Sequence, residues 1–296
     1  MENKANLFIV GAMKAGTTSF IETLSTHPEI YVSPVKEPHY FVKELPRELY
    51  QDSRFFDLDK YLDHQFPEPL HITKIKTEAQ YARLFSLAQK ETYKAEASTA
   101  YLHAPEAARL IHAYNAEARI IMILRDPLKR AFSHYKMNLS LGKEKRTFEK
   151  AMQNDLEKYD NDTLHWHSYL GMSCYDHAVK RFEKYFSHIH IIRFEDLMKH
   201  PESVFSALEN FLGIAPFTRI ATEHKNESKA LRFQKLFYVL KQFGLKDYFS
   251  KIFSATFRQW LFRKVTKNKK QEMVLTETTT LRLVEVFKKE SQQWSS

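Results

Sequence analysis

The sequence predicts an α/β fold, in which a mostly parallel sheet of the P-loop type is flanked by helices and followed by a helical C-terminal extension. Two observations lead to this prediction. Short apolar runs alternate with helical patterns through about residue 215, and a glycine-containing loop directly follows the first apolar run. Strands that alternate with helices pair in parallel and are covered on both faces. Ligands of such sheets bind at the carboxyl ends of the strands, so residues that carry chemistry are expected just after strands.

Five apolar runs are expected to form buried strands, at residues 7–10, 30–32, 92–97, 119–124 and 190–194. The segments between them have helical patterns. The segment that starts at Thr17 carries apolar residues on one face and ends before Pro28. Another begins with Thr77 and Gln80 at capping-box spacing, and a third starts with Pro105 near its first turn, where proline is tolerated.

The C-terminal third, from residue 221, has a mainly helical pattern. Apolar residues at three- and four-residue spacing form one stripe between Leu245 and Leu261, and a run rich in Lys and Arg follows. No Gly/Ser/Pro linker precedes it, so we expect one domain over residues 1–296, with a core at about 5–215 and a helical part at about 221–296. The stripe is expected to pack on the core. The alternatives are that it lines a substrate cleft or that residues 244–270 make a peripheral membrane contact.

Composition sets limits on the setting and the partners. No stretch of eighteen uncharged apolar residues occurs, so no transmembrane helix is predicted, and the first apolar run is too short for a secretory signal. Cys174 is the single cysteine, which makes an intramolecular disulfide impossible and indicates a reducing, cytoplasmic setting. The formal net charge of +9 favours anionic partners but does not distinguish a functional field from a solvated basic face.

The loop "GAMKAGTTS", residues 11–19, resembles a P-loop with a displaced lysine. Gly11 and Gly16 keep the spacing of G-x-x-x-x-G-K-[ST], but Thr17 stands where the lysine belongs and Lys14 lies inside the loop. Backbone N–H groups at such a turn and at the following helix N-terminus bind anions. The lysine position favours a phosphate-bearing donor other than a magnesium nucleotide. The alternative is a strand–turn–helix in which the glycines and the lysine are incidental.

The segment "SPVKEPHYF", residues 33–41, contains a candidate general base. Pro38 biases Glu37 toward an extended conformation, in which Glu37 and His39 project together and Lys36 projects to the opposite side. A carboxylate beside an imidazole can remove a proton from an attacking hydroxyl or amine. The alternative is a solvated loop whose proline ends the strand.

The segment "RIIMILRDPLKRAFSHY", residues 119–135, supplies a second candidate anion site. Arg125, at the carboxyl end of a strand, can hold a phosphate with two N–H bonds, and Ser133 on the next helix can donate to the same phosphate. A magnesium-binding role for Asp126 is less favoured, because Arg125 would lie against the metal. The alternative is a salt bridge at Arg125 with Ser133 buried and satisfied.

Together these segments resemble the sulfotransferases that use 3′-phosphoadenosine 5′-phosphosulfate (PAPS), and in motif style the glycosaminoglycan or carbohydrate type and the bacterial enzymes. The matching stretches are "GAMKAGTTS", "KEPHYF", "LRDPLKRAFSHY", "YLGMSCY" and "RFEDLMKHPESVFSALENFLGI". The resemblance runs from Leu7 to about Gly213, with weaker traces at "KNES" and in a last helix that ends at Trp294. "RFEDL" is similar to a structural strand-to-loop feature without a chemical role.

The resemblance implies roles for individual residues. The donor's 5′-phosphosulfate would be bound by Lys14, Ala15, Gly16, Thr17, Thr18 and Ser19, and its 3′-phosphate by Arg125 and Ser133. Glu37 matches the catalytic base, and His39 matches the histidine two residues on.

Two departures from the family pattern concern the acceptor more than the donor. Ala97 stands where the glycosaminoglycan enzymes have a lysine. Near Asn226 there is no clear counterpart of the loop that binds the adenosine side, for which Lys229 or Arg232 is the candidate substitute.

The resemblance therefore predicts metal-free, in-line transfer of a sulfuryl group from PAPS to a hydroxyl or amine, with 3′,5′-diphosphoadenosine (PAP) as product. Glu37 would take the acceptor's proton and Lys14 would stabilise the leaving group. A carbohydrate acceptor is expected, and neither a metal nor nucleic acid is expected as a partner. A lipid or small-molecule acceptor, a metal-dependent P-loop kinase, and a basic binding module without chemistry are the alternatives.

Overall fold

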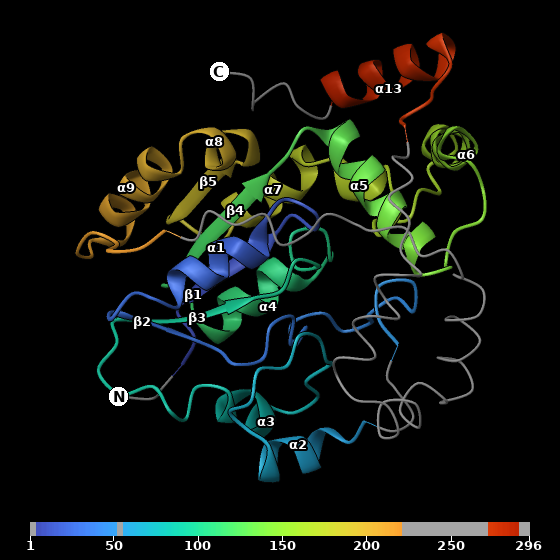
Figure 1. Cartoon of the computed structure of the whole chain (residues 1–296). Helices are drawn as coiled ribbons and strands as arrows, with labels where there is room; N and C mark the ends of the chain where they lie inside the picture. The colour runs from blue at the N-terminus through green and yellow to red at the C-terminus, as the bar shows by residue number, and fades with distance from the viewer. Residues whose placement is uncertain (1–3, 52–55, 221–271, 290–296) are drawn as a thin grey trace, which may run out of the picture.

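The computed structural model describes residues 4–51, 56–220 and 272–289, and in this part of the chain five strands form a single parallel sheet (Figure 1). The strand order is β2-β3-β1-β4-β5, and all four neighbouring pairs are parallel. The strands are β1 Leu7–Gly11, β2 Ile30–Val32, β3 Tyr93–Ala97, β4 Arg119–Leu124 and β5 Ile189–Arg193. The predicted fold class and the five predicted strands are confirmed, because these runs are apolar enough to be buried inside a parallel sheet.

The helices before the second anion motif are α1 Thr17–Leu24, α2 Leu58–His64, α3 Glu78–Arg83 and α4 Ala107–Tyr114. Those after it are α5 Pro127–Ser140, α6 Phe148–Asp160, α7 Asp176–Glu183, α8 Phe194–Lys199, α9 Pro201–Leu212 and α13 Glu277–Lys289, with a 3₁₀ turn η1 at Gly171–Ser173. The predicted capping box is confirmed at α3, where Thr77 and Gln80 exchange side-chain and backbone hydrogen bonds.

Helices cover both faces of the sheet. On one face the Tyr93 hydroxyl donates to the carbonyl of Leu212 in α9 over 2.5 Å. On the other face Phe8 packs edge-on against Tyr114 of α4, with 6.5 Å between ring centroids. A second apolar cluster joins α5, α6 and α13, and Figure 1 shows α13 beside α6. The loops that carry the sequence motifs follow the carboxyl ends of β1, β2 and β4.

The segment "RFEDL" at the end of β5 differs from its prediction. "RFEDL" was expected to be a strand-to-loop feature, and this is wrong: β5 ends at Arg193 and helix α8 begins at Phe194. Glu195 and Asp196 lie in its first turn, where acidic side chains stabilise a helix. The stripe from 245 to 261, the segment 244–270, Lys229 and Arg232 lie outside the described residues. Among the helices that are described, none has the length and apolar character needed to span a bilayer.

Candidate active site

The loop after β1 has a backbone that only glycine fits at one position. Gly16 is the N-cap of α1 with φ 81°, and a Cβ atom there would lie 2.9 Å from the ring of Phe194. Lys14 also has a left-handed backbone, with φ 72°. In the described chain no side chain caps α1, so the N–H groups of its first turn face the loop with no intrahelical partner. This is the geometry of an anion site at a helix N-terminus.

The loop meets the second anion motif directly. Nη1 of Arg125 donates to the carbonyl oxygen of Lys14 over 2.9 Å. Burial lowers the pKa of Lys14, and the positive charges of Arg125, Lys136, Arg130 and Lys36 lower it further. Cations from several elements therefore converge on Lys14, and an anion bound there would relieve their mutual repulsion.

The start of α5 explains why Asp126 is a poor metal ligand. Its carboxylate accepts from the backbone N–H of Lys129 over 2.7 Å and so caps the helix. Its own N–H donates to Glu195 over 3.1 Å.

The guanidinium of Arg125 lies 4.6 Å from the ring centroid of Phe194 and has no ion-pair partner among the described carboxylates. Ser133 lies half-buried in the second turn of α5.

The backbone around Glu37 differs from the prediction. Glu37 and His39 have φ angles of 58° and 52°, so the extended conformation expected from Pro38 is wrong. The N–H of Glu37 donates to the Ala97 carbonyl over 2.8 Å, and its carbonyl accepts from the Thr73 N–H over 3.2 Å. These tertiary hydrogen bonds fix the loop and override the local preference of a residue before proline.

The side chains of Glu37 and His39 nevertheless lie together, as expected. Glu37 is 6% exposed. Its carboxylate accepts from the N–H of Thr99 over 2.7 Å and lies 3.4 Å from Nε2 of His39. Lys36 was expected on the opposite side, and this is also wrong: its Nζ lies 3.1 Å from Oε1 of Glu37. The left-handed backbone of Glu37 brings both neighbours to one side.

The electrostatics of this pair set the protonation of both side chains. Burial by itself raises the pKa of Glu37, but the charge of Lys36, the neighbouring imidazole of His39 and the Thr99 hydrogen bond outweigh it, so the net pKa is lowered. Burial lowers the pKa of His39 despite the neighbouring carboxylate. At neutral pH the carboxylate is therefore ionised and the imidazole is neutral.

The segment just after β3 supplies partners that the sequence motifs did not reveal. The hydroxyl of Thr99 bonds the Glu37 carboxylate at 3.1 Å, and Oγ of Ser98 accepts from the N–H of His39 over 3.0 Å. Their position at the carboxyl end of a predicted strand was the available signal.

In the ranges 4–51, 56–220 and 272–289, no group of three or more His, Cys, Asp or Glu side chains is arranged to hold a metal ion.

The fold and the site together combine a loop after β1 that is surrounded by cations with a buried, ionised carboxylate on the loop after β2. The model of a family described as "Sulfotransferase family" matches residues 6–219. The chain therefore belongs to the sulfotransferase family, and the enzyme class predicted from the sequence is confirmed at the level of the family.

Similar proteins agree with this family. Human carbohydrate sulfotransferase 15 is 25% identical over 177 residues, a match that covers 54% of this chain and 32% of the relative. Mouse bifunctional heparan sulfate N-deacetylase/N-sulfotransferase 4 is 28% identical over 244 residues, which cover 76% of this chain and 23% of the relative. The crystal structure of a sulfotransferase from Alicyclobacillus acidocaldarius has a TM-score of 0.58 and 28% identity, and the match covers 80% of this chain and 92% of that one. The chain thus spans a third or less of the two curated relatives.

Proposed function

We propose that this protein transfers the sulfuryl group of PAPS to a hydroxyl or amine of a carbohydrate acceptor. The observation that carries the proposal is the hydrogen bond between Arg125 and the Lys14 carbonyl, because it joins the two anion motifs into one cationic site. The buried, ionised Glu37 lies on a neighbouring loop, and the charge of Lys36 acts on both Lys14 and Glu37. A donor with a 5′-phosphosulfate and a 3′-phosphate matches two linked anion motifs beside a base.

In the proposed reaction, Glu37 removes the proton of the acceptor O–H or N–H. A bond forms between the acceptor atom and sulfur as the bond between sulfur and the bridging oxygen breaks. The electron pair of that broken bond stays on the phosphate of PAP. Lys14 and the N–H groups at the start of α1 stabilise this developing charge, since preorganised donors act strongly where water is excluded.

The remaining site residues are assigned to the donor. Ala15, Gly16, Thr17, Thr18 and Ser19 would surround the 5′-phosphosulfate. Arg125 and Ser133 would bind the 3′-phosphate, and Nη1 of Arg125 is already oriented by the loop. Lys229 and Arg232 stay a prediction from the sequence.

The donor assignment predicts metal-independent nucleotide selectivity. In the presence of EDTA the protein is expected to bind PAP at least about tenfold more tightly than ADP, because only PAP carries a 3′-phosphate for Arg125. Isothermal titration calorimetry with each nucleotide measures this ratio. Preference for ADP, or binding that requires magnesium, would contradict the proposal.

Replacement of Lys14 predicts a loss of turnover more than a loss of folding. Lys14→Ala is expected to lower kcat with PAPS by about 10²–10³, because the charge on the leaving phosphate loses its closest cation. Release of PAP in single-turnover assays measures the effect. Lys129→Ala, which removes an exposed lysine of α5, is the matched control and should keep normal turnover. An equal effect of the two replacements would remove Lys14 from this role.

A carbohydrate acceptor is supported by the names of the relatives and by the cations around Glu37. The charge of Lys36 acts on Glu37 and also on His71, whose pKa is lowered mainly by burial. Assays with labelled PAPS and a panel of glycans, lipids and phenols test the acceptor class. Labelling of only the lipid or phenol arms would redirect the acceptor assignment and leave the donor assignment in place. A cytoplasmic setting and a membrane contact through residues 244–270 stay predictions from the sequence.

A further inference from the structure

Arg130, on α5, is a fully buried arginine that is held only by neutral groups. Its exposed fraction is 0%. Nε donates to Oγ of Ser173 and Nη2 donates to the carbonyl oxygen of Tyr169, each over 2.7 Å. In the described chain, Nη1 is buried without a hydrogen-bond partner, and no carboxylate forms an ion pair with this guanidinium. A buried cation without a counter-ion is costly, so its retention calls for an explanation.

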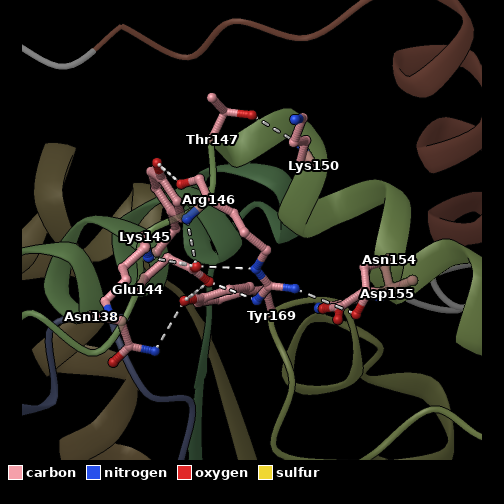
Figure 2. A network of polar contacts seen from close by, with 11 residues as sticks. Asn138, Glu144, Lys145, Arg146, Thr147, Lys150, Asn154, Asp155 and Tyr169 are labelled. Carbon is pink, nitrogen blue, oxygen red and sulfur yellow. Dashed lines mark hydrogen bonds and ion pairs between the residues drawn. The ribbon is translucent and has the colours of Figure 1, made fainter.

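A buried carboxylate network that includes Tyr169 pairs with a different arginine, Arg146 (Figure 2). Arg146 donates to Glu144 through Nη2 at 2.7 Å and Nε at 3.0 Å, and the Tyr169 hydroxyl donates to the same carboxylate at 3.1 Å. Tyr169 thus connects the two arginines, with its hydroxyl on the Glu144 side and its carbonyl on Arg130. The negative charge of this network is already paired with Arg146, and Arg130 forms no ion pair with a carboxylate in the described chain.

Arg130 interacts electrostatically with Arg125 and Lys14, two cations of the proposed donor site. The pKa of Arg130 is lowered to about 10, mainly by burial. Tyr175 and Cys174 oppose this lowering, Arg125 adds to it, and Asp155 opposes it to a smaller extent. Arg130 in turn contributes to the lowered pKa of Lys14 and of His134. Its charge therefore acts on the loop after β1.

The position of Arg130 along α5 links it to the expected 3′-phosphate ligands. Ser133 follows three residues later, and side chains at this spacing lie on the same face of a helix. Arg125 precedes the helix by two residues and is bonded to the loop. Arg130 is therefore a buried cation that acts on Lys14 and Arg125, which are both proposed donor ligands.

We propose that Arg130 is a donor-selectivity residue, whose buried positive charge is compensated by the 3′-phosphate of the bound donor. This inference rests on the proposed function. It assigns Arg130 an electrostatic effect on the 3′-phosphate, additional to its hydrogen bonds to Ser173 and Tyr169. The free protein then carries an unpaired charge that binding of the donor neutralises.

The test is the affinity ratio between PAP and 5′-AMP, which differ only in the 3′-phosphate. Arg130→Gln removes the charge and keeps amide donors for Ser173 and Tyr169, and it is expected to reduce the ratio at least about tenfold relative to the native protein. Arg130→Lys keeps the charge and is expected to retain most of the ratio. Arg181→Met is the matched control, because Arg181 is held by the carbonyls of Leu102 and His103 and is absent from the charges acting on Lys14.

The outcomes separate this inference from the function on which it rests. A native protein that binds PAP and 5′-AMP equally would overturn the proposed donor, and the inference with it. A native preference that Arg130→Gln leaves unchanged would overturn the inference alone. If the Gln variant does not fold, Arg130→Lys decides: a ratio that collapses although the charge is kept would show that hydrogen-bond geometry, and not charge, sets the preference.

Discussion

Glu37→Gln is expected to lower kcat by about 10²–10⁴ while the KM for PAPS changes little, because the carboxylate acts on the acceptor's proton and not on the donor. The amide keeps the shape of the carboxylate, and its oxygen can still accept the Thr99 N–H bond of 2.7 Å. The variant should therefore fold normally. Initial-rate measurements at saturating acceptor test the effect.

The control for this replacement lies on the same loop. Glu44 is exposed, and Glu44→Gln should have normal turnover. Near-normal turnover in Glu37→Gln would exclude the base role. The pH profile adds a check, since the pKa of Glu37 is lowered from 4.5 and a base is active when ionised. The acidic limb of kcat is thus expected below pH 4.5, with no further loss near pH 6.5 from the neutral His39.

How much of this site the sequence could predict depends on the range of the interactions. The strands follow from local apolar runs, and the capping box of α3 follows from Thr77 and Gln80, three residues apart. The meeting of Lys14 and Arg125 could be anticipated, because both follow parallel strands whose carboxyl ends lie at one edge. In each case a local pattern or a rule of topology is sufficient.

The conformation of Glu37 could not be predicted in the same way. Its backbone is set by hydrogen bonds to Ala97 and Thr73, and its carboxylate by Thr99, 62 residues away. Local preference pointed to an extended loop, and these long-range bonds reversed it. The missing hydrogen-bond partner of Arg130 Nη1 in the described chain could not be predicted for the same reason, since it depends on which distant residues pack around the guanidinium.

Glu96 is a second buried acidic residue that interacts electrostatically with the proposed base, and the second large effect that we expect comes from its burial. It lies on β3 in register with Phe8 and is 1% exposed. In the described chain neither carboxylate oxygen has a partner within hydrogen-bond geometry, although the Tyr101 hydroxyl is near enough to affect it. Burial raises the pKa of Glu96 to about 8; the Tyr101 hydroxyl opposes this rise and the charge of Glu37 adds to it.

This raised pKa makes the stability of the protein depend on pH. In the unfolded chain Glu96 ionises near pH 4.5, whereas in the folded protein it keeps its proton up to about pH 8. Between these values the folded state binds more protons than the unfolded state, so the free energy of unfolding falls as the pH rises. Over the interval from pH 5 to pH 8 the loss from this group is about 4 kcal/mol, at about 1.4 kcal/mol per unit.

Glu96→Gln replaces the carboxyl group with a neutral one of the same shape and removes this loss. The variant is expected to match the native protein at pH 5 and to exceed its free energy of unfolding by about 4 kcal/mol at pH 8. Urea unfolding at pH 5, 6.5 and 8 measures the difference, and Glu117→Gln, at an exposed position, is the control that should show none. Stability curves for Glu96→Gln and the native protein that stay parallel from pH 5 to pH 8 would mean that the carboxyl group is ionised in the folded state. The ionised carboxylate would then need hydrogen bonds from nearby hydroxyls such as those of Tyr81 and Tyr101. It would also place a second negative charge near Glu37.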